Sequence, residues 1–128
     1  MYIEIDFESR EAIYLQLRNY IIKEIALSRL KNGDTLPSVR QMAEYVGINM
    51  HTVNKAYTVL RQEGFVDMDK RRGAVIAVDQ DKLQVLSEMK KDFTLAITKG
   101  YCKNVTKEEV LSLIEDIYKE YDEASLSR

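Results

Sequence analysis

Cysteine, histidine, proline and tryptophan are nearly absent from this sequence, which has one, one, one and none of them in 128 residues. The single cysteine, Cys102, cannot form a disulfide within the chain, and one cysteine with one histidine cannot build a Cys/His zinc site. No run approaches the roughly 18 apolar residues of a membrane span. The N-terminus carries acidic residues where a signal peptide carries basic ones. We therefore expect a cytoplasmic protein without a metal, a cofactor or a membrane segment.

Charge is unevenly distributed along the chain, whose formal net charge is −2. Residues 1–37 carry 5 basic and 6 acidic residues, residues 38–78 carry 6 and 4, and residues 79–128 carry 8 and 11. Only the middle part is net positive. Local charge matters more than the total for binding a polyanion, so an acidic chain is compatible with a nucleic-acid partner.

The residues from Gly47 to Gly64 predict one short helix with defined ends. Asn49 is a favoured N-cap residue, and Gly64 supplies a stop signal. One face is apolar at helical spacing and is formed by Val53, Ala56, Tyr57 and Leu60. The opposite face and its flanks carry donors and acceptors that can reach base edges in a DNA major groove. These residues are His51, Thr52, Asn54, Lys55, Thr58 and Gln62.

A second short helix is predicted immediately before this one. Ser38 and Gln41 have capping-box spacing, and an apolar stripe at helical spacing runs from there to Gly47. Two short helices joined by a tight glycine-containing turn, the second presenting polar groups outward, form the helix-turn-helix pattern. Arg40 stands in the first turn, where the helix dipole disfavours a positive charge. We therefore favour a DNA-phosphate role for Arg40 over that of a solvated surface arginine.

Further elements are predicted on both sides of this helix pair. Residues 11–27 keep helical apolar spacing, whereas residues from Tyr2 to Phe7 alternate weakly, as in a short edge strand or an arm. After the pair, residues 65–69 and 74–78 read as the strands of a β-hairpin. Its tip is Lys70, Arg71, Arg72 and Gly73. A charged tip is often only a solvated loop, but directly after a helix-turn-helix it predicts a wing that touches phosphates or the minor groove.

Residues from about Ile13 to Val78 resemble the winged helix-turn-helix of GntR-family transcription regulators, and the short tail resembles that of the YtrA-type subfamily. The matching positions are residues 13–17, 30, 33–43, 49, 52–53, 56–57, 60 and 63–65. The resemblance implies that Arg40 contacts DNA and that the protein is a dimer that controls a nearby operon, often one for a transporter. The chain departs from the family pattern at Ser28, where glycine is usual, at Met50, at His51 and in the wing.

Residues 80–128 predict two more helices, each with an apolar stripe. Lys99 to Tyr101 are expected to mark the bend between them, and Thr106 with Glu109 to form a capping box. A pair of about fifty residues has too small an interior to bury both stripes, so a second copy of the chain is the expected partner. The residues expected in that interface are Leu86, Met89, Phe93, Ile97, Leu113, Ile114, Ile117 and Tyr121.

The predicted fold is mainly α with a small β-hairpin wing. A winged helix-turn-helix DNA-binding domain is expected at residues 11–79 and an antiparallel two-helix dimerisation domain at residues 80–128. Lys55 and Asn54 carry the strongest expectation of base contact, whereas capping already explains Asn49. The full set of expected DNA-binding residues is Ser38, Arg40, Asn49, His51, Thr52, Asn54, Lys55, Thr58, Lys70, Arg71, Arg72 and Gly73.

The sequence therefore predicts a sequence-specific DNA-binding transcription regulator, as a homodimeric repressor on an inverted-repeat double-stranded operator. Catalysis has little support, because the carboxylates are scattered and no nucleophile has a histidine partner in a recognisable setting. The alternative is a winged-helix module that binds another protein, which would favour an acidic or apolar third helix and an uncharged wing tip. Any small-molecule effector would have to sit between subunits or between domains. Neither the effector nor the regulated genes can be named from the sequence.

Overall fold

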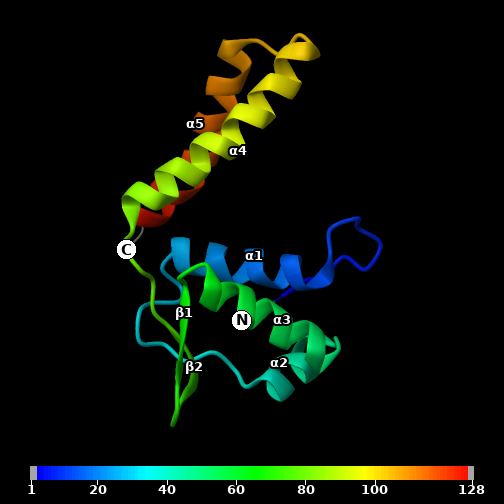
Figure 1. Ribbon diagram of the computed structural model, residues 1–128, viewed down its shortest axis with the longest axis vertical. Coiled ribbons are helices and arrows are strands. Elements are labelled where there is room, and N and C mark those ends of the chain that lie inside the picture. The colour runs from blue at the N-terminus through cyan, green and yellow to red at the C-terminus, as the bar shows by residue number, and fades with distance from the viewer. Residues whose placement is uncertain (1–2, 127–128) are drawn as a thin grey trace. The chain divides into compact units, whose positions relative to one another are not determined.

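A computed structural model describes residues 3–126 as two compact units, the first ending at Asp79 and the second beginning at Gln80. The first unit contains the helices α1 (Ile13–Ala26), α2 (Val39–Val46) and α3 (Met50–Gln62), followed by the strands β1 (Val66–Asp69) and β2 (Gly73–Ile76). The second contains the helices α4 (Lys82–Cys102) and α5 (Lys107–Leu126). Figure 1 shows these elements. The fold is therefore mainly helical with one small hairpin, as the sequence predicts.

The core of the first unit lies where α1, α2 and the hairpin meet α3. All four residues predicted for the inner face of α3 are buried, because helical spacing brings them onto one side. The buried apolar residues are Leu17, Ile21, Leu36, Met42, Ala43, Val53, Ala56, Tyr57, Leu60, Val66, Ala74, Val75 and Ile76. Each helix thus contributes one apolar side, β2 is buried over residues 74–76, and α3 is held with its opposite side exposed.

The ends of α2 and α3 are fixed by local chemistry, as predicted. The Ser38 hydroxyl accepts a hydrogen bond of 3.1 Å from the backbone N–H of Gln41, and the Gln41 side chain completes the capping box. Gly47, with a φ of +78°, closes α2 in the left-handed region. The Asn49 side-chain oxygen then accepts a 2.7 Å hydrogen bond from the N–H of His51 and caps α3. The short spacing between these two helices is therefore set by their own caps.

The wing, residues 66–76, is an antiparallel hairpin in which Val66 pairs with Ile76 and Asp69 with Gly73. Its base is secured to the segment before α2, because the Leu36 N–H donates to the Ala74 carbonyl at 2.8 Å. The sequence predicts that side chains of β1 alternate between buried and exposed, but only Val66 in this strand is buried. Met68 is half exposed although it follows Val66 at a two-residue period, because the free end of the hairpin extends beyond the core.

Two alternatives were predicted for the N-terminal segment, an edge strand or an arm, and the strand is not formed. Residues 3–6 are irregular, residues 7–10 form a turn and a bend, and Tyr2 lies outside the described residues. The Gln16 side chain exchanges two hydrogen bonds of 2.9 Å with the backbone of Asp6, and it donates a third to the Glu11 carbonyl. The side chain of Gln16 therefore hydrogen-bonds the backbone N–H and carbonyl of Asp6, which in a sheet would bond to a neighbouring strand. Helix α1 begins at Ile13, two residues after the predicted start near Glu11.

The bend in the second unit lies later than predicted. Helix α4 continues through Gly100 to Cys102, and Asn104, with a φ of +65°, makes the turn. The N–H of Val105 donates to the Gly100 carbonyl at 2.9 Å, in a Schellman closure. A Cβ on Gly100 would lie 3.4 Å from the Val105 Cβ, which is an ordinary van der Waals contact, so Gly100 lies inside the helix and is not its stop signal.

The capping box at the start of α5 is present as predicted. The N–H of Glu109 donates to the Thr106 hydroxyl at 3.1 Å, and the N–H of Thr106 donates to the Glu109 carboxylate at 2.9 Å. These bonds lower the pKa of Glu109.

None of the helices in residues 3–126 is both long enough and apolar enough to cross a membrane.

Candidate nucleic-acid interface

The exposed side of α3 offers polar side chains in a row along the helix. His51, Asn54, Lys55 and Thr58 are exposed, and Thr52 is half-buried at the edge of this face. Within residues 3–126, the side chains of His51 and Asn54 make no hydrogen bond, so their donors and acceptors are available to a ligand. The Thr58 hydroxyl instead donates a 2.8 Å bond to the Asn54 carbonyl inside the helix. His51 and Asn54 therefore carry the hydrogen-bonding groups of this face that are most available to a ligand.

Two of the residues predicted to bind DNA have a structural role as helix caps. Ser38 and Asn49 use their side-chain oxygens as the caps of α2 and α3. Both are exposed, each at the N-terminus of its own helix. They hold the helix-turn-helix geometry, and any contact with a ligand is additional to that role.

Lys55 is placed differently from the other polar residues of α3. Its ammonium lies 4.1 Å from the centroid of the Tyr14 ring on α1, a cation–π contact. The sequence analysis did not identify Tyr14, which helical spacing assigns to the apolar side of α1. No local signal could have identified the pair, because the two residues come together only through the packing of α1 on α3.

Met50 is a second residue that the sequence analysis passed over as a possible contact. It is the first residue of α3 and is 45% exposed, so it lies beside Asn49 and His51 at the N-terminal end of this helix. An apolar residue outside the buried stripe of an amphipathic helix is the signal that could have found it. Such a side chain can contact a thymine methyl group in a major groove.

The wing tip presents its three cations unequally. The Asp69 carboxylate accepts hydrogen bonds from the N–H groups of Arg71 and Arg72, at 2.8 and 3.0 Å, and these bonds lower the pKa of Asp69. The Arg72 guanidinium also lies 3.8 Å from Asp69 and donates to the Gly33 carbonyl at 3.3 Å. No such contact holds the Lys70 and Arg71 side chains within the described residues. These two are therefore the free cations of the tip.

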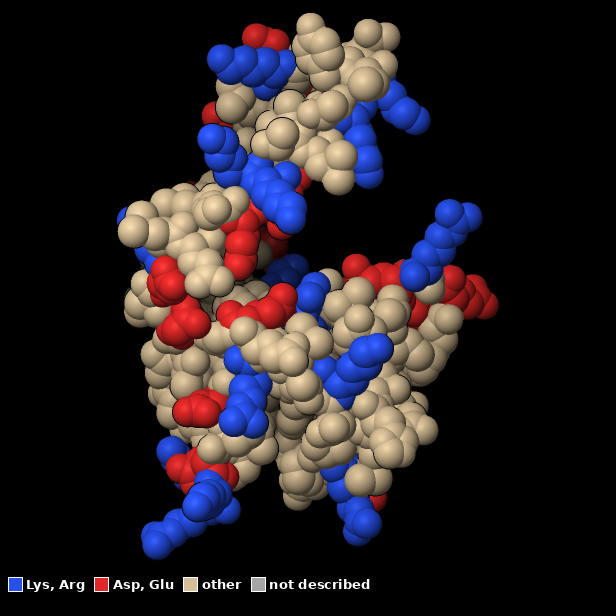
Figure 2. All heavy atoms as spheres, in the orientation of Figure 1, with Lys and Arg blue, Asp and Glu red and all other residues tan. Residues whose placement is uncertain are grey.

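Positive charge gathers at the free end of the hairpin, where Figure 2 shows projecting blue side chains. Arg40, in the first turn of α2, is likewise exposed and makes no ion pair within residues 3–126. The exposed side of α3 lies in the same compact unit as these cations. A polar helix face accompanied by cations can bind a phosphodiester backbone while its centre meets the bases.

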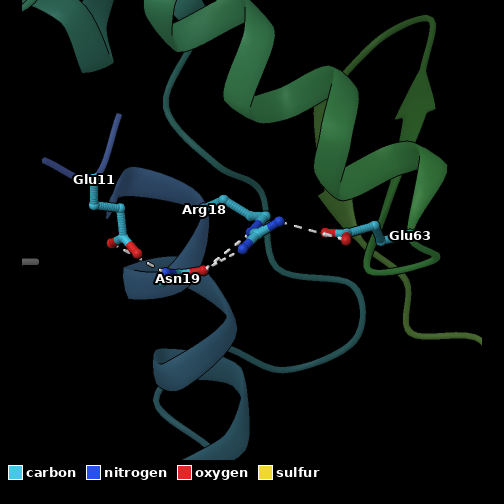
Figure 3. Close-up of polar contacts among 4 residues, drawn as sticks. All are labelled: Glu11, Arg18, Asn19 and Glu63. Atoms are coloured by element: carbon cyan, nitrogen blue, oxygen red, sulfur yellow. Dashed lines mark hydrogen bonds and ion pairs between the residues drawn. The ribbon is translucent and has the colours of Figure 1, made fainter. Parts of the chain in front are cut away.

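A polar network fixes α1 at the end of α3 (Figure 3). The Arg18 guanidinium lies 3.5 Å from the Glu63 carboxylate and donates to the Asn19 side-chain oxygen at 2.8 and 3.0 Å. Asn19 in turn donates to Glu11 at 3.4 Å. Such largely exposed contacts add little stability, and they link α1 to the C-cap of α3.

In the part of the chain that the structure describes, the histidine, cysteine, aspartate and glutamate residues form no group of three or more that could hold a metal ion.

An open surface hollow lies along α4. It is lined in part by Leu86, Met89, Phe93 and Ile97, which are four of the residues predicted for a dimer interface.

The remaining predicted interface residues lie on α5. Leu113 and Ile117 are exposed, whereas Ile114 and Tyr121 are half-buried. Helix α4 has no buried residue at all. The second unit therefore exposes apolar side chains along both of its helices, and exposed apolar patches commonly mark interaction surfaces.

Comparison with known proteins places these features among transcription regulators. Residues 10–76 match the family model described as bacterial regulatory proteins, gntR family. The HTH-type transcriptional regulator YhcF of Bacillus subtilis (strain 168) is 32% identical over 114 residues, which cover 85% of this chain and 92% of that protein. The HTH-type transcriptional repressor YtrA of the same organism is 41% identical over 76 residues, which cover 59% of this chain but only 58% of YtrA.

A solved structure resembles most of the chain. The crystal structure of a transcriptional antiterminator from Listeria monocytogenes EGD-e has a TM-score of 0.85 and 27% sequence identity to it. The match covers 94% of this chain and 92% of that one. The likeness therefore extends beyond the first unit into the two-helix tail.

Proposed function

Because the chain belongs to the gntR family of bacterial regulatory proteins, we propose that it is a homodimeric repressor that binds an inverted-repeat operator in double-stranded DNA. The observation that carries the proposal is the exposed polar face of α3, which shares one compact unit with Arg40 and a cationic wing tip. A regulator of this kind acts in the cytoplasm, where the bacterial operator is. Its relatives are named as transcription regulators, and none of the names given above is that of an enzyme.

The residues divide into two kinds of contact. Asn54 can form a bidentate pair with an adenine edge, and His51 offers a ring nitrogen to the neighbouring position. Arg40, Lys70 and Arg71 are exposed cations suited to phosphates, which position the helix without carrying sequence information. The affinity then comes largely from the cations and the specificity from α3.

Homodimerisation is supported by the apolar surface of the second unit. Phe93 is 48% exposed and Ile117 60% exposed, and each belongs to a stripe that continues along its helix. A second copy of the chain supplies an equivalent stripe, so the same patch can be buried on both subunits. A two-fold dimer then requires an inverted repeat, with half-sites roughly one helical turn, about 34–36 Å, apart or a multiple of it.

Repression is supported by the name of the relative YtrA, a transcriptional repressor. Repression also requires nothing beyond operator binding, because a bound dimer can exclude another protein from the same DNA.

The proposal is tested by selecting bound sites from random duplexes and then titrating the selected duplex in a gel shift. We expect a selected site with a dyad, bound by a dimer. Selected sites without any dyad would contradict the symmetric arrangement. A chain that binds no duplex but retains a protein partner would instead favour the protein-binding module.

A further inference from the structure

Tyr14 and Lys55 form a pair that joins α1 to the exposed side of α3. An aromatic face attracts an ammonium within about 6 Å of its centroid through the ring quadrupole. The observed distance of 4.1 Å is well inside that range. Tyr14 packs against the core of the first unit, whereas Lys55 is exposed. The tyrosine is therefore the anchored member, and the contact restricts a lysine whose stem would otherwise sample many rotamers.

The contact also determines where the charge of Lys55 lies. An ammonium over a ring of α1 stands at the flank of α3 that adjoins α1 and not over the middle of its exposed face. An α-helix with its side chains is about 10–12 Å across, and the B-DNA major groove is about 12 Å wide. A helix seated in that groove therefore brings its flanks to the phosphate walls and its middle to the base edges.

We propose that Tyr14 is a positioning residue that holds the Lys55 ammonium for a phosphate contact, so that Lys55 supplies affinity and not base readout. The inference rests on the proposed function, because it requires α3 to enter the major groove. It reverses the role that the sequence alone suggested for Lys55. An ammonium suits the new role, since it binds phosphate as a compact point charge. Base readout then falls to Asn54 and His51.

The experiment uses the full chain with Tyr14→Leu, Tyr14→Phe, Lys55→Met and the double variant Tyr14→Leu/Lys55→Met. The dissociation constant is measured by fluorescence anisotropy at several salt concentrations, for the selected operator and for a random duplex. Lys55→Met should weaken binding to both duplexes to a similar degree. It should also flatten the slope of log affinity against log salt by about 0.9 per subunit, while the selected sequence stays the same.

Tyr14→Leu keeps an apolar side chain of similar bulk but removes the ring. It should weaken operator binding by about two- to fivefold, the fold-change that corresponds to an exposed cation–π contact. In the Lys55→Met background the same change should have no further effect. Tyr14→Phe keeps the ring and should retain the wild-type affinity.

A matched control separates positioning from a general loosening of α1. Tyr20→Leu removes another half-buried tyrosine ring from the same helix. Both leucine variants should lower the midpoint of thermal unfolding, but only the binding loss of Tyr14→Leu should depend on Lys55. An equal loss from Tyr14→Leu in both lysine backgrounds would overturn the inference.

Two other results would also overturn it. Intact affinity in Lys55→Met with a changed base preference at one operator position would return Lys55 to base readout. A loss of affinity in Tyr14→Phe as large as that in Tyr14→Leu would make the hydroxyl the important group. A wild-type chain that binds no DNA would overturn the proposed function itself, whereas wild-type binding with an unaffected Tyr14→Leu would overturn only this inference.

Discussion

The Tyr57 hydroxyl on α3 donates a 2.7 Å hydrogen bond to the Pro37 carbonyl, in the extended segment that leads into α2. Pro37 has no N–H and immediately precedes the Ser38 cap. One bond therefore ties the buried side of α3 to the entry of α2. It helps to fix the relative position of the two helices that carry Arg40 and Asn54.

Replacing Tyr57 with phenylalanine should lower the free energy of unfolding by about 0.5–1.5 kcal/mol, the net value of one such hydrogen bond. Urea titration followed by circular dichroism measures this free energy.

Burial also raises the pKa of Tyr57 in the folded chain. Above about pH 10 the unfolded tyrosine ionises while the folded one does not, so stability falls as the pH rises beyond that value. Tyr57→Phe should remove this part of the alkaline loss, and an identical pH profile in both proteins would contradict the assignment.

Ser28 follows the C-cap of α1 with a φ of +59°, in the left-handed region that disfavours most side chains. The N–H groups of Arg29 and Leu30 donate to the Glu24 carbonyl around this turn, at 2.9 and 3.2 Å, which keeps Ser28 in place. Ser28→Gly should therefore stabilise the chain by roughly 0.5–1 kcal/mol in thermal or urea unfolding.

The matched control for Ser28 is the reverse change at Gly47, whose φ is +78° and where an added Cβ would meet no atom within 4 Å. Gly47→Ala should cost about 1–2 kcal/mol, since only the backbone conformation opposes it. A destabilising Ser28→Gly would mean that the serine side chain contributes more than its strained backbone costs.

The wing should contribute to the salt dependence of DNA binding through Lys70 and Arg71 more than through Arg72. Arg71→Ala should flatten the slope of log affinity against log salt by about 0.9 per subunit if the guanidinium contacts one phosphate. Arg72→Ala should change it less, because Asp69 and the Gly33 carbonyl already engage that side chain. Equal slopes for the two variants would show that DNA draws Arg72 away from these partners. An unchanged slope in both would show that the wing tip does not touch DNA.

Asn54→Ala should lose discrimination at one operator position by roughly 1–3 kcal/mol, because the side-chain amide is exposed on α3 and available to a base edge. Binding to random duplex should change little. Arg40→Ala is the contrasting variant and should weaken binding to operator and random duplex alike. The measurement is a repeat of site selection with each variant. An unaltered selected sequence for Asn54→Ala would show that α3 is oriented differently on the DNA.

Phe93→Asp should convert the dimer to a monomer at micromolar concentration, because it places a charge in the apolar stripe of α4. Ile117→Glu tests the stripe of α5 in the same way. Lys91→Glu is the control, since it is two residues from Phe93 and therefore on another side of the helix. Light scattering measures the mass of each variant. A monomeric wild-type chain would end the proposal of a dimer through this unit.

Much of the first unit could be predicted because its helix ends are encoded locally. Ser38 with Gln41, Asn49, Gly47 and Gly64 each act on backbone groups within a few residues, so sequence spacing alone specifies where α2 and α3 begin and end. Amphipathic spacing likewise determined which side of α3 is buried. The family resemblance drew on the same stretches, and the family-model match confirms it.

Features that depend on distant partners were decided by the tertiary structure. The N-terminal segment is not a strand, because the Gln16 side chain takes its backbone groups. Lys55 lies at the flank of α3, because packing brings the Tyr14 ring beneath its ammonium. Arg72 differs from Arg71 because residue 33 happens to lie beside the folded wing. In each case, the sequence position of the side chain is compatible with several partners. Only the packing of the elements determined which partner lies close enough for contact.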